Sequence, residues 1–92
     1  MPLTEQQALD TACHFLAGLR RTLPYPVIDV PVDCRHVEGS QPPRVVADSA
    51  TIGGDFWEFD FMYDAGRLLV DPSGVRIFVD AKTGAAALFS PR

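Results

Sequence analysis

The sequence predicts an α+β fold in which one N-terminal amphipathic helix packs on one face of a four- or five-stranded antiparallel sheet. The first observation is that residues 56–84 alternate aromatic or β-branched residues with charged ones, and turn residues interrupt this alternation three times. Such a pattern is typical of antiparallel strands that turn one face to a core and the other to solvent. The second observation is that apolar residues recur at helical spacing near the N-terminus. A length of 92 residues fits a single domain, residues 1–92.

The helix is expected to run from about Glu5 to Arg21. Thr4 and Gln7 fit a capping box, in which the side chain of each residue bonds the backbone N–H of the other. Pro24 lies just beyond the expected end and cannot continue a helix. One broad face of this helix is apolar, and its residues are Ala8, Leu9, Ala12, Cys13, Phe15, Leu16 and Leu19.

Two further strands are predicted between this helix and the central stretch. Residues 25–36 alternate apolar and polar residues, and Pro26 and Pro31 place this strand at a sheet edge, because proline cannot donate a hydrogen bond to a ladder. Residues 38–43 are predicted to form a loop, and residues 44–52 a weaker strand.

The strongest strand signal lies in residues 56–63. Side chains alternate between the faces of a strand, so one set is expected to face the core, namely Trp57, Phe59, Phe61 and Tyr63. After a turn at residues 71–74, residues 75–80 are predicted to form a strand that directs Val75, Ile77 and Val79 inward.

A hairpin turn at residues 82–84 is predicted to lead into a last strand at residues 85–89. Asp80 is expected to accept backbone hydrogen bonds in this turn, and Gly84 to take a positive φ. Both residues are therefore interpreted as structural.

The charge of the chain favours some classes of binding partner over others. The chain carries a formal net charge of −4 and has a sequence pI of about 4.8. An acidic domain repels phosphate backbones, which disfavours nucleic acid and suits a basic partner protein. No apolar run reaches the ~18 residues of a membrane span, and the N-terminus lacks the basic start and apolar run of a signal peptide. We therefore expect no membrane insertion and a cytoplasmic, unprocessed protein.

The sequence shows no arrangement typical of catalysis or metal binding. His14 is expected on the helix surface and His36 at the end of the edge strand, so the two histidines need not meet. No serine lies in a GxSxG frame. Cys13 and Cys34 are expected to be buried, reduced thiols. We therefore expect no catalytic residue, no cofactor and no metal site.

The sheet face turned away from the core is the candidate interaction site. Three apolar residues on neighbouring strands are ringed there by charge, which suits either an ordinary face partly covered by a loop or the C-terminal segment, or a partner-binding patch. The hypothesised partner-binding residues are Phe56, Glu58, Asp60, Met62, Arg76 and Phe78.

Four motifs together suggest a family: AxxxAxxFL from Ala8, PVIDV from Pro26, WxFxF from Trp57 and IFVDxxTG from Ile77. In this order they resemble the small bacterial YrhB-like domain, which is grouped with the immunity proteins of polymorphic toxin systems. The resemblance implies a non-catalytic protein that binds a cognate toxin domain stoichiometrically and occludes it.

Other interpretations stay open at this stage. The exposed sheet face could instead serve a homodimeric structural or chaperone-like protein. A small enzyme would need His14 or His36 beside a carboxylate in a pocket, and a small ligand would need a cleft between helix and sheet. An acidic contact through Glu38 and Asp48 is the main rival surface for a toxin partner.

Overall fold

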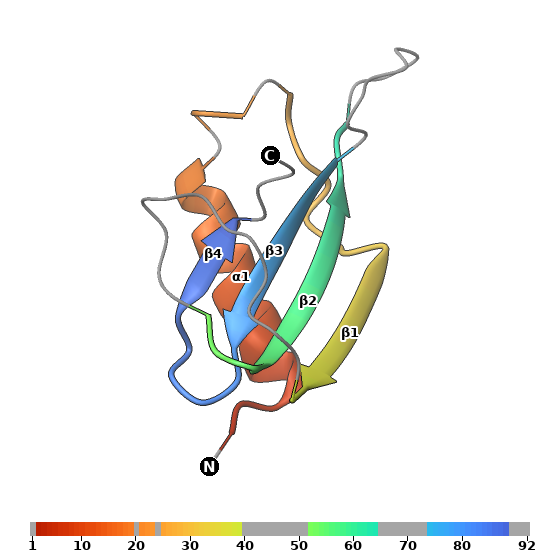
Figure 1. The fold of residues 1–92 in the computed structure, drawn as a ribbon. Helices are drawn as coiled ribbons and strands as arrows, with labels where there is room; N and C mark the ends of the chain where they lie inside the picture. The colour runs from red at the N-terminus through yellow and green to blue at the C-terminus, as the bar shows by residue number, and fades with distance from the viewer. Residues whose placement is uncertain (1, 20, 24, 40–51, 65–73, 89–92) are drawn as a thin grey trace.

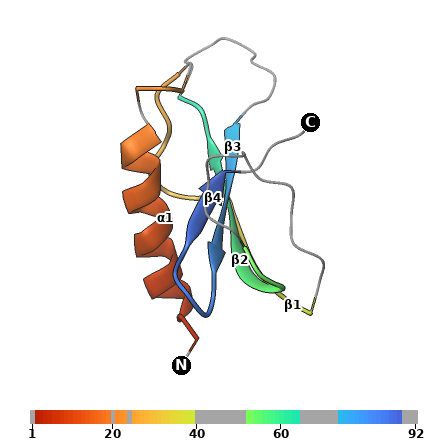
Figure 2. The ribbon, with the colours of Figure 1, turned by 60° about the vertical axis from the view of Figure 1, so that its left-hand side comes forward.

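One helix packs across one face of a four-stranded antiparallel sheet, which confirms the predicted fold class (Figure 1). The computed structural model describes residues 2–19, 21–23, 25–39, 52–64 and 74–88. The sheet runs in the order β1-β2-β3-β4, each strand antiparallel to the next. Figure 2 shows the helix standing against one side of the sheet. The elements are α1 (Glu5–Leu19), β1 (Asp33–Glu38), β2 (Asp55–Met62), β3 (Gly74–Asp80) and β4 (Ala86–Leu88).

The predicted capping box begins α1. The backbone N–H of Thr4 donates to Gln7 Oε1 at 3.0 Å, and the backbone N–H of Gln7 donates to Thr4 Oγ1 at 3.2 Å. The helix ends at Leu19, earlier than expected, because the backbone N–H and the hydroxyl of Thr22 both donate to the Leu19 carbonyl oxygen and form a turn there. Among the described residues, no helix has both the length and the apolar character needed to cross a membrane.

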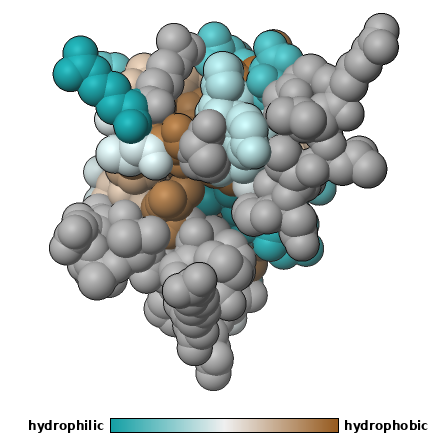
Figure 3. Space-filling model, turned by 90° about the horizontal axis from the view of Figure 1, so that it is seen from above, coloured by the Kyte–Doolittle hydropathy of each residue, from teal (hydrophilic) through white to brown (hydrophobic). Residues whose placement is uncertain are grey.

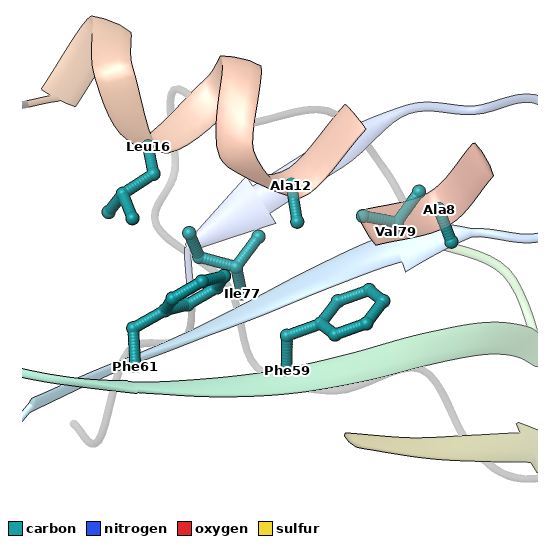
Figure 4. Packing of buried hydrophobic residues seen from close by; sticks show 7 residues of the cluster. All are labelled: Ala8, Ala12, Leu16, Phe59, Phe61, Ile77 and Val79. Carbon is teal, nitrogen blue, oxygen red and sulfur yellow. The ribbon is translucent and has the colours of Figure 1, made fainter. Parts of the chain in front are cut away.

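The main core lies between α1 and the inner face of the sheet (Figure 4). The residues predicted to face inward from residues 57–61 and 75–79 do so, and Trp57 is fixed at the margin because its Nε1–H donates to the Leu3 carbonyl oxygen at 3.2 Å. Two small helix residues let α1 approach the aromatic rings closely. The fully buried members of this cluster are Ala8, Ala12, Leu16, Phe59, Phe61, Ile77 and Val79.

The edge strand is shorter at its start than predicted. The strand β1 begins at Asp33 instead of residue 25, although it is an edge strand as expected. The preceding segment touches the end of β2 at two separated points, where the backbone N–H groups of Ile28 and Val32 donate to the carbonyl oxygens of Met62 and Asp60. Residues 29–31 lie between these contacts and are not in a strand, as expected where Pro31 has no N–H to donate.

The turn between β3 and β4 has the predicted chemistry. The Oδ1 atom of Asp80 accepts the backbone N–H groups of Lys82 and Thr83 at 2.8 and 2.9 Å, and Gly84 has a φ of 74°. The Oδ2 atom accepts the backbone N–H of Gly53 at 2.8 Å. Burial alone would raise the pKa of Asp80, but these backbone hydrogen bonds outweigh it and lower that pKa below its ordinary value.

Several predicted segments fall outside the described residues. They are most of the loop at residues 38–43, most of the weaker strand at 44–52 and most of the turn at 71–74. Ile52, the last residue of that weaker strand, is described; it is buried and lies in no strand.

Candidate partner-binding surface

The face of the sheet opposite α1, called here the outer face, carries all six residues that the sequence suggested for partner binding. Strand alternation places four of them on β2 and two on β3, and the register sets Asp60 opposite Arg76 and Glu58 opposite Phe78. The predicted orientation of the strands is therefore confirmed. The structure divides these six residues between two halves of the face with different surroundings.

The first half is apolar and closed. The rings of Phe56 and Phe78 meet edge to face, with centroids 5.4 Å apart, and the two residues are only 4% and 3% exposed. Ile52 and Ala87 pack with them in a second hydrophobic cluster, and Val37 is half-buried against it. The expectation that these two aromatic residues would offer exposed contact surface is therefore wrong, because Ile52 and Ala87 pack with them.

The second half is charged and open. Five side chains line a cavity of about 180 Å³ there, called here the charged cavity, and they are Asp33, Arg35, Glu58, Asp60 and Arg76. Arg76 Nε lies 2.9 Å from Glu58 Oε1 and 2.7 Å from Asp60 Oδ1. Arg35 Nη2 lies 3.0 Å from Glu58 Oε2. Arg76 therefore bridges two carboxylates of β2, Glu58 and Asp60.

Glu58 is the central anion of the charged cavity. Its side chain is only 10% exposed, and two guanidinium groups compensate its charge, as a buried carboxylate requires. The hydrogen bond that Arg76 donates to Asp60, together with the negative charges around it, raises the pKa of Arg76 above its ordinary value, against the opposing effect of burial. Arg76 is thus held as a cation in a fixed position.

Two carboxylates of the charged cavity face each other across the β1–β2 ladder. Asp33 is the direct cross-strand partner of Asp60, and like charges placed directly opposite destabilise a sheet. Asp60 is neutralised by Arg76. Asp33 Oδ1 accepts the backbone N–H of Cys34 at 2.9 Å, but Asp33 forms no ion pair with a described residue. Among the described residues, the charge of Asp33 therefore acts only at longer range on Arg76, and Asp33 is the lining carboxylate of the cavity that no arginine contacts.

Exposed apolar side chains lie beside the charged cavity. Met62 is 38% exposed and continues the outer face of β2 beyond Asp60. Ile28, whose backbone N–H donates to the Met62 carbonyl oxygen at 2.9 Å, is 47% exposed. Figure 3 shows the molecule from above, where some hydrophobic surface of the described residues lies among hydrophilic surface. We call Ile28, Val30, Val32 and Met62, the exposed large apolar residues of the described chain, the edge patch.

Sequence reasoning missed two lining residues of the charged cavity and the members of the edge patch that precede β1. Asp33 and Arg35 enter the charged cavity through the pairing register of β1 with β2, which local patterns do not give. Ile28 lay in a predicted strand, where alternation alone does not show that it is exposed.

The chain was compared with known proteins by family, by sequence and by structure. No family model, curated protein or solved structure matches it. The geometry of the outer face, together with the motif resemblance, is therefore the basis for a proposal of function.

The inner face holds a smaller polar cluster at the end of the β1–β2 pair. Ligand atoms of His36, Glu38 and Asp55 lie within 4.8 Å of one another. The structure already gives this imidazole partners, because His36 Nε2 lies 2.7 Å from Asp55 Oδ1 and the ring stacks on Trp57 at a centroid distance of 4.4 Å. Exposed acidic groups are common without a metal ion, so this cluster alone assigns none.

The remaining candidate residues lie apart from the charged cavity. His14 is exposed on α1, and Asp48 lies outside the described residues. Cys13 and Cys34 are free thiols but only half-buried, which corrects the expectation of full burial. Burial, and then nearby carboxylates, raise the pKa of both thiols, so they are held protonated and are poor nucleophiles.

Proposed function

We propose that this chain is an immunity protein that binds a cognate bacterial toxin domain and occludes it, stoichiometrically and without turnover. The observation that carries the proposal is the open charged cavity of the outer face, with the exposed edge patch beside it. The motif resemblance to YrhB-like domains supports the same function. The proposed place of binding is the cytoplasm of the cell that makes the toxin.

The charged cavity suits recognition because its groups are held in place before a partner arrives. Glu58 and Asp60 are on β2, Arg76 is on β3, and ion pairs join them. Groups that are already ordered lose little conformational freedom on binding, which favours affinity. The net charge of −4 complements a basic surface, such as the substrate cleft of a toxin that acts on nucleic acid, and speeds encounter with it.

The proposed contact set differs from the one suggested by the sequence. Glu58, Asp60, Met62 and Arg76 stay in it, because they line the charged cavity or lie beside it. Phe56 and Phe78 leave the contact set, because they are buried in the free chain.

The test begins with recovery of the partner by a tagged chain from the producing cell, and continues with both purified proteins. Support requires a one-to-one complex by light scattering and loss of toxin activity at equimolar chain. Asp60→Lys is expected to weaken this complex by about a hundredfold, because it reverses a charge that the partner would meet. Recovery of the chain alone, or of many unrelated unfolded proteins, would contradict the proposal.

A matched control keeps this test specific to the outer face. Asp10→Lys makes the same charge change at an exposed carboxylate of α1, on the opposite side of the sheet. It is expected to leave toxin binding unchanged. Equal losses in both variants would show that only the overall charge of the chain matters, and would exclude the outer face as the contact.

A second candidate function is a homodimer, and the edge patch is the observation that favours it. Ile28, Val30 and Val32 are exposed along the segment before the edge strand β1, and exposed apolar residues at a sheet edge favour pairing with another chain. Sedimentation of the chain alone separates the two candidates. A dimer that Val30→Lys dissociates would support this function, and a monomer at all concentrations would exclude it.

A further inference from the structure

The like-charge pair of the outer face points to what the charged cavity binds. Asp33 and Asp60 oppose each other directly across the ladder, and of the two only Asp60 is in ion-pair contact with an arginine of the described chain, whereas Asp33 acts on Arg76 at longer range. Such a pair lowers the stability of the sheet. The open carboxylate is exposed and lines the cavity, so a group from outside can reach it.

We propose that the charged cavity receives one cationic side chain, arginine or lysine, of the partner protein, which lies between Asp33 and Asp60. The identity of that partner rests on the proposed function, but the cation site itself does not. An arginine would bring a planar fork of N–H donors that matches the geometry of a carboxylate.

The charges of the charged cavity favour a cation over an anion. Three carboxylates and two guanidinium groups line it, which leaves one net negative charge. An incoming anion would have to compete with Glu58 for Arg35 and with Asp60 for Arg76, and it would meet the charge of Asp33. A cation meets that carboxylate directly and relieves the repulsion between the two aspartates.

The surroundings of the charged cavity also fit the stem of such a side chain. Arginine and lysine carry an aliphatic chain that packs along apolar surface while the charged end stays in a polar site. Met62 and Ile28 expose apolar surface next to the cavity. The same partner residue can therefore contact the edge patch with its stem and Asp33 with its charge.

The first test uses the free chain and a small probe. Acetyl-arginine amide is titrated into ¹⁵N-labelled protein, and its neutral isostere acetyl-citrulline amide serves as the control probe. The arginine probe is expected to shift the amide resonances of residues 33 and 60, with a dissociation constant about fivefold or more below that of the citrulline probe. Equal responses to both probes, or shifts confined to other residues, would overturn the cation site.

Asp33→Asn gives the matched variant. Its amide oxygen can still accept the Cys34 backbone N–H, so the fold is expected to survive, and the Tm checks this. Binding of the arginine probe is expected to fall about fivefold. Glu38→Gln removes a carboxylate from the same strand but from the inner face, and should not change binding of the probe. An unchanged affinity in Asp33→Asn would contradict the proposal.

The two proposals can fail separately. If a toxin complex forms and Asp33→Asn weakens it about tenfold or more, both are supported. If the complex forms and this variant leaves its affinity unchanged, the cation site is excluded and the immunity function stands. If the arginine probe binds as expected but no toxin partner is recovered, the immunity function fails and the cation site stands.

Discussion

The two halves of the outer face share the same strands and alternation but differ in what lies over them. At one end, Phe56 and Phe78 are closed by Ile52 and Ala87 into a second small core. At the other end, the charged cavity stays open, and ion pairs instead of apolar contacts join its side chains. We expect the closed half to contribute stability and the open half to be the one that a partner can reach.

The largest expected effect is the loss of an aromatic ring from the closed half. Phe78→Ala removes a side chain that is 3% exposed and leaves a cavity beside Phe56 and Ile52. The free energy of unfolding is expected to fall by about 3–4 kcal/mol, measured by urea denaturation. Met62→Ala is the control on the open half and should change it by less than about 0.5 kcal/mol, because Met62 is exposed. Similar values for the two variants would break the division.

The next effect concerns Asp80, which holds the segment before β2 that carries Ile52. Asp80 binds the backbone N–H of Gly53, the neighbour of Ile52, and two N–H groups of the β3–β4 turn. Asp80→Asn is expected to lower the free energy of unfolding by about 1–2 kcal/mol at pH 7, because charge-assisted hydrogen bonds weaken.

The pH dependence of this variant follows from the lowered pKa of Asp80. A carboxylate whose pKa is lower in the folded state stabilises the fold above its unfolded pKa, near the ordinary value of 3.8, and loses this contribution as the pH falls through the folded pKa. The difference in unfolding free energy between wild type and Asp80→Asn should therefore shrink below that region. Asp10→Asn, at an exposed helix position, should show a small difference at every pH. A difference for Asp80→Asn that stays constant down to low pH would contradict this account.

A stability effect of similar size is expected at the centre of the charged cavity. Glu58→Gln takes the charge away from Arg35 and Arg76, and should lower the unfolding free energy by about 1–2 kcal/mol. The coupling to each arginine can be measured by double-mutant cycles. Coupling to Arg35 should be below about 1 kcal/mol, because its side chain is 69% exposed, and coupling to Arg76 should be larger. A larger coupling to Arg35 would mean that β1, not β3, anchors the cavity.

What could be predicted from the sequence was encoded locally. The alternation of residues 56–63 gave the inner and outer faces of β2, because side-chain direction in a strand follows from position alone. Thr4 and Gln7 gave the helix start, and Asp80 and Gly84 gave the turn, because each pair acts over a few residues. The predicted start of β1 was wrong, because residues 29–31 interrupt the pairing of this segment with β2.

What could not be predicted depends on contacts between distant segments. The burial of Phe78 requires Ile52 to pack against it. Ile52 precedes β2 in the sequence and Phe78 follows it, and no periodicity reports such a contact. The opposition of Asp33 and Asp60 likewise depends on register, since a shift of one residue would turn either side chain to the other face. The candidate site was therefore found only in part, through the residues of β2 and β3.

The smallest expected effect, and the only one that raises stability, comes from the like-charge pair. Asp33→Asn removes the repulsion with Asp60 and keeps the acceptor for the Cys34 N–H, so the Tm should rise by about 1–4 °C. Asp60→Asn removes the same repulsion but also the carboxylate that Arg76 binds, so its Tm should fall. A rise in Tm for Asp33→Asn and a fall in Tm for Asp60→Asn would show that Asp33 lowers the stability of the fold, as a residue used for binding can. A lower Tm in both variants would mean that Asp33 belongs to the stabilising ion pairs, and the open half would then be structural as well.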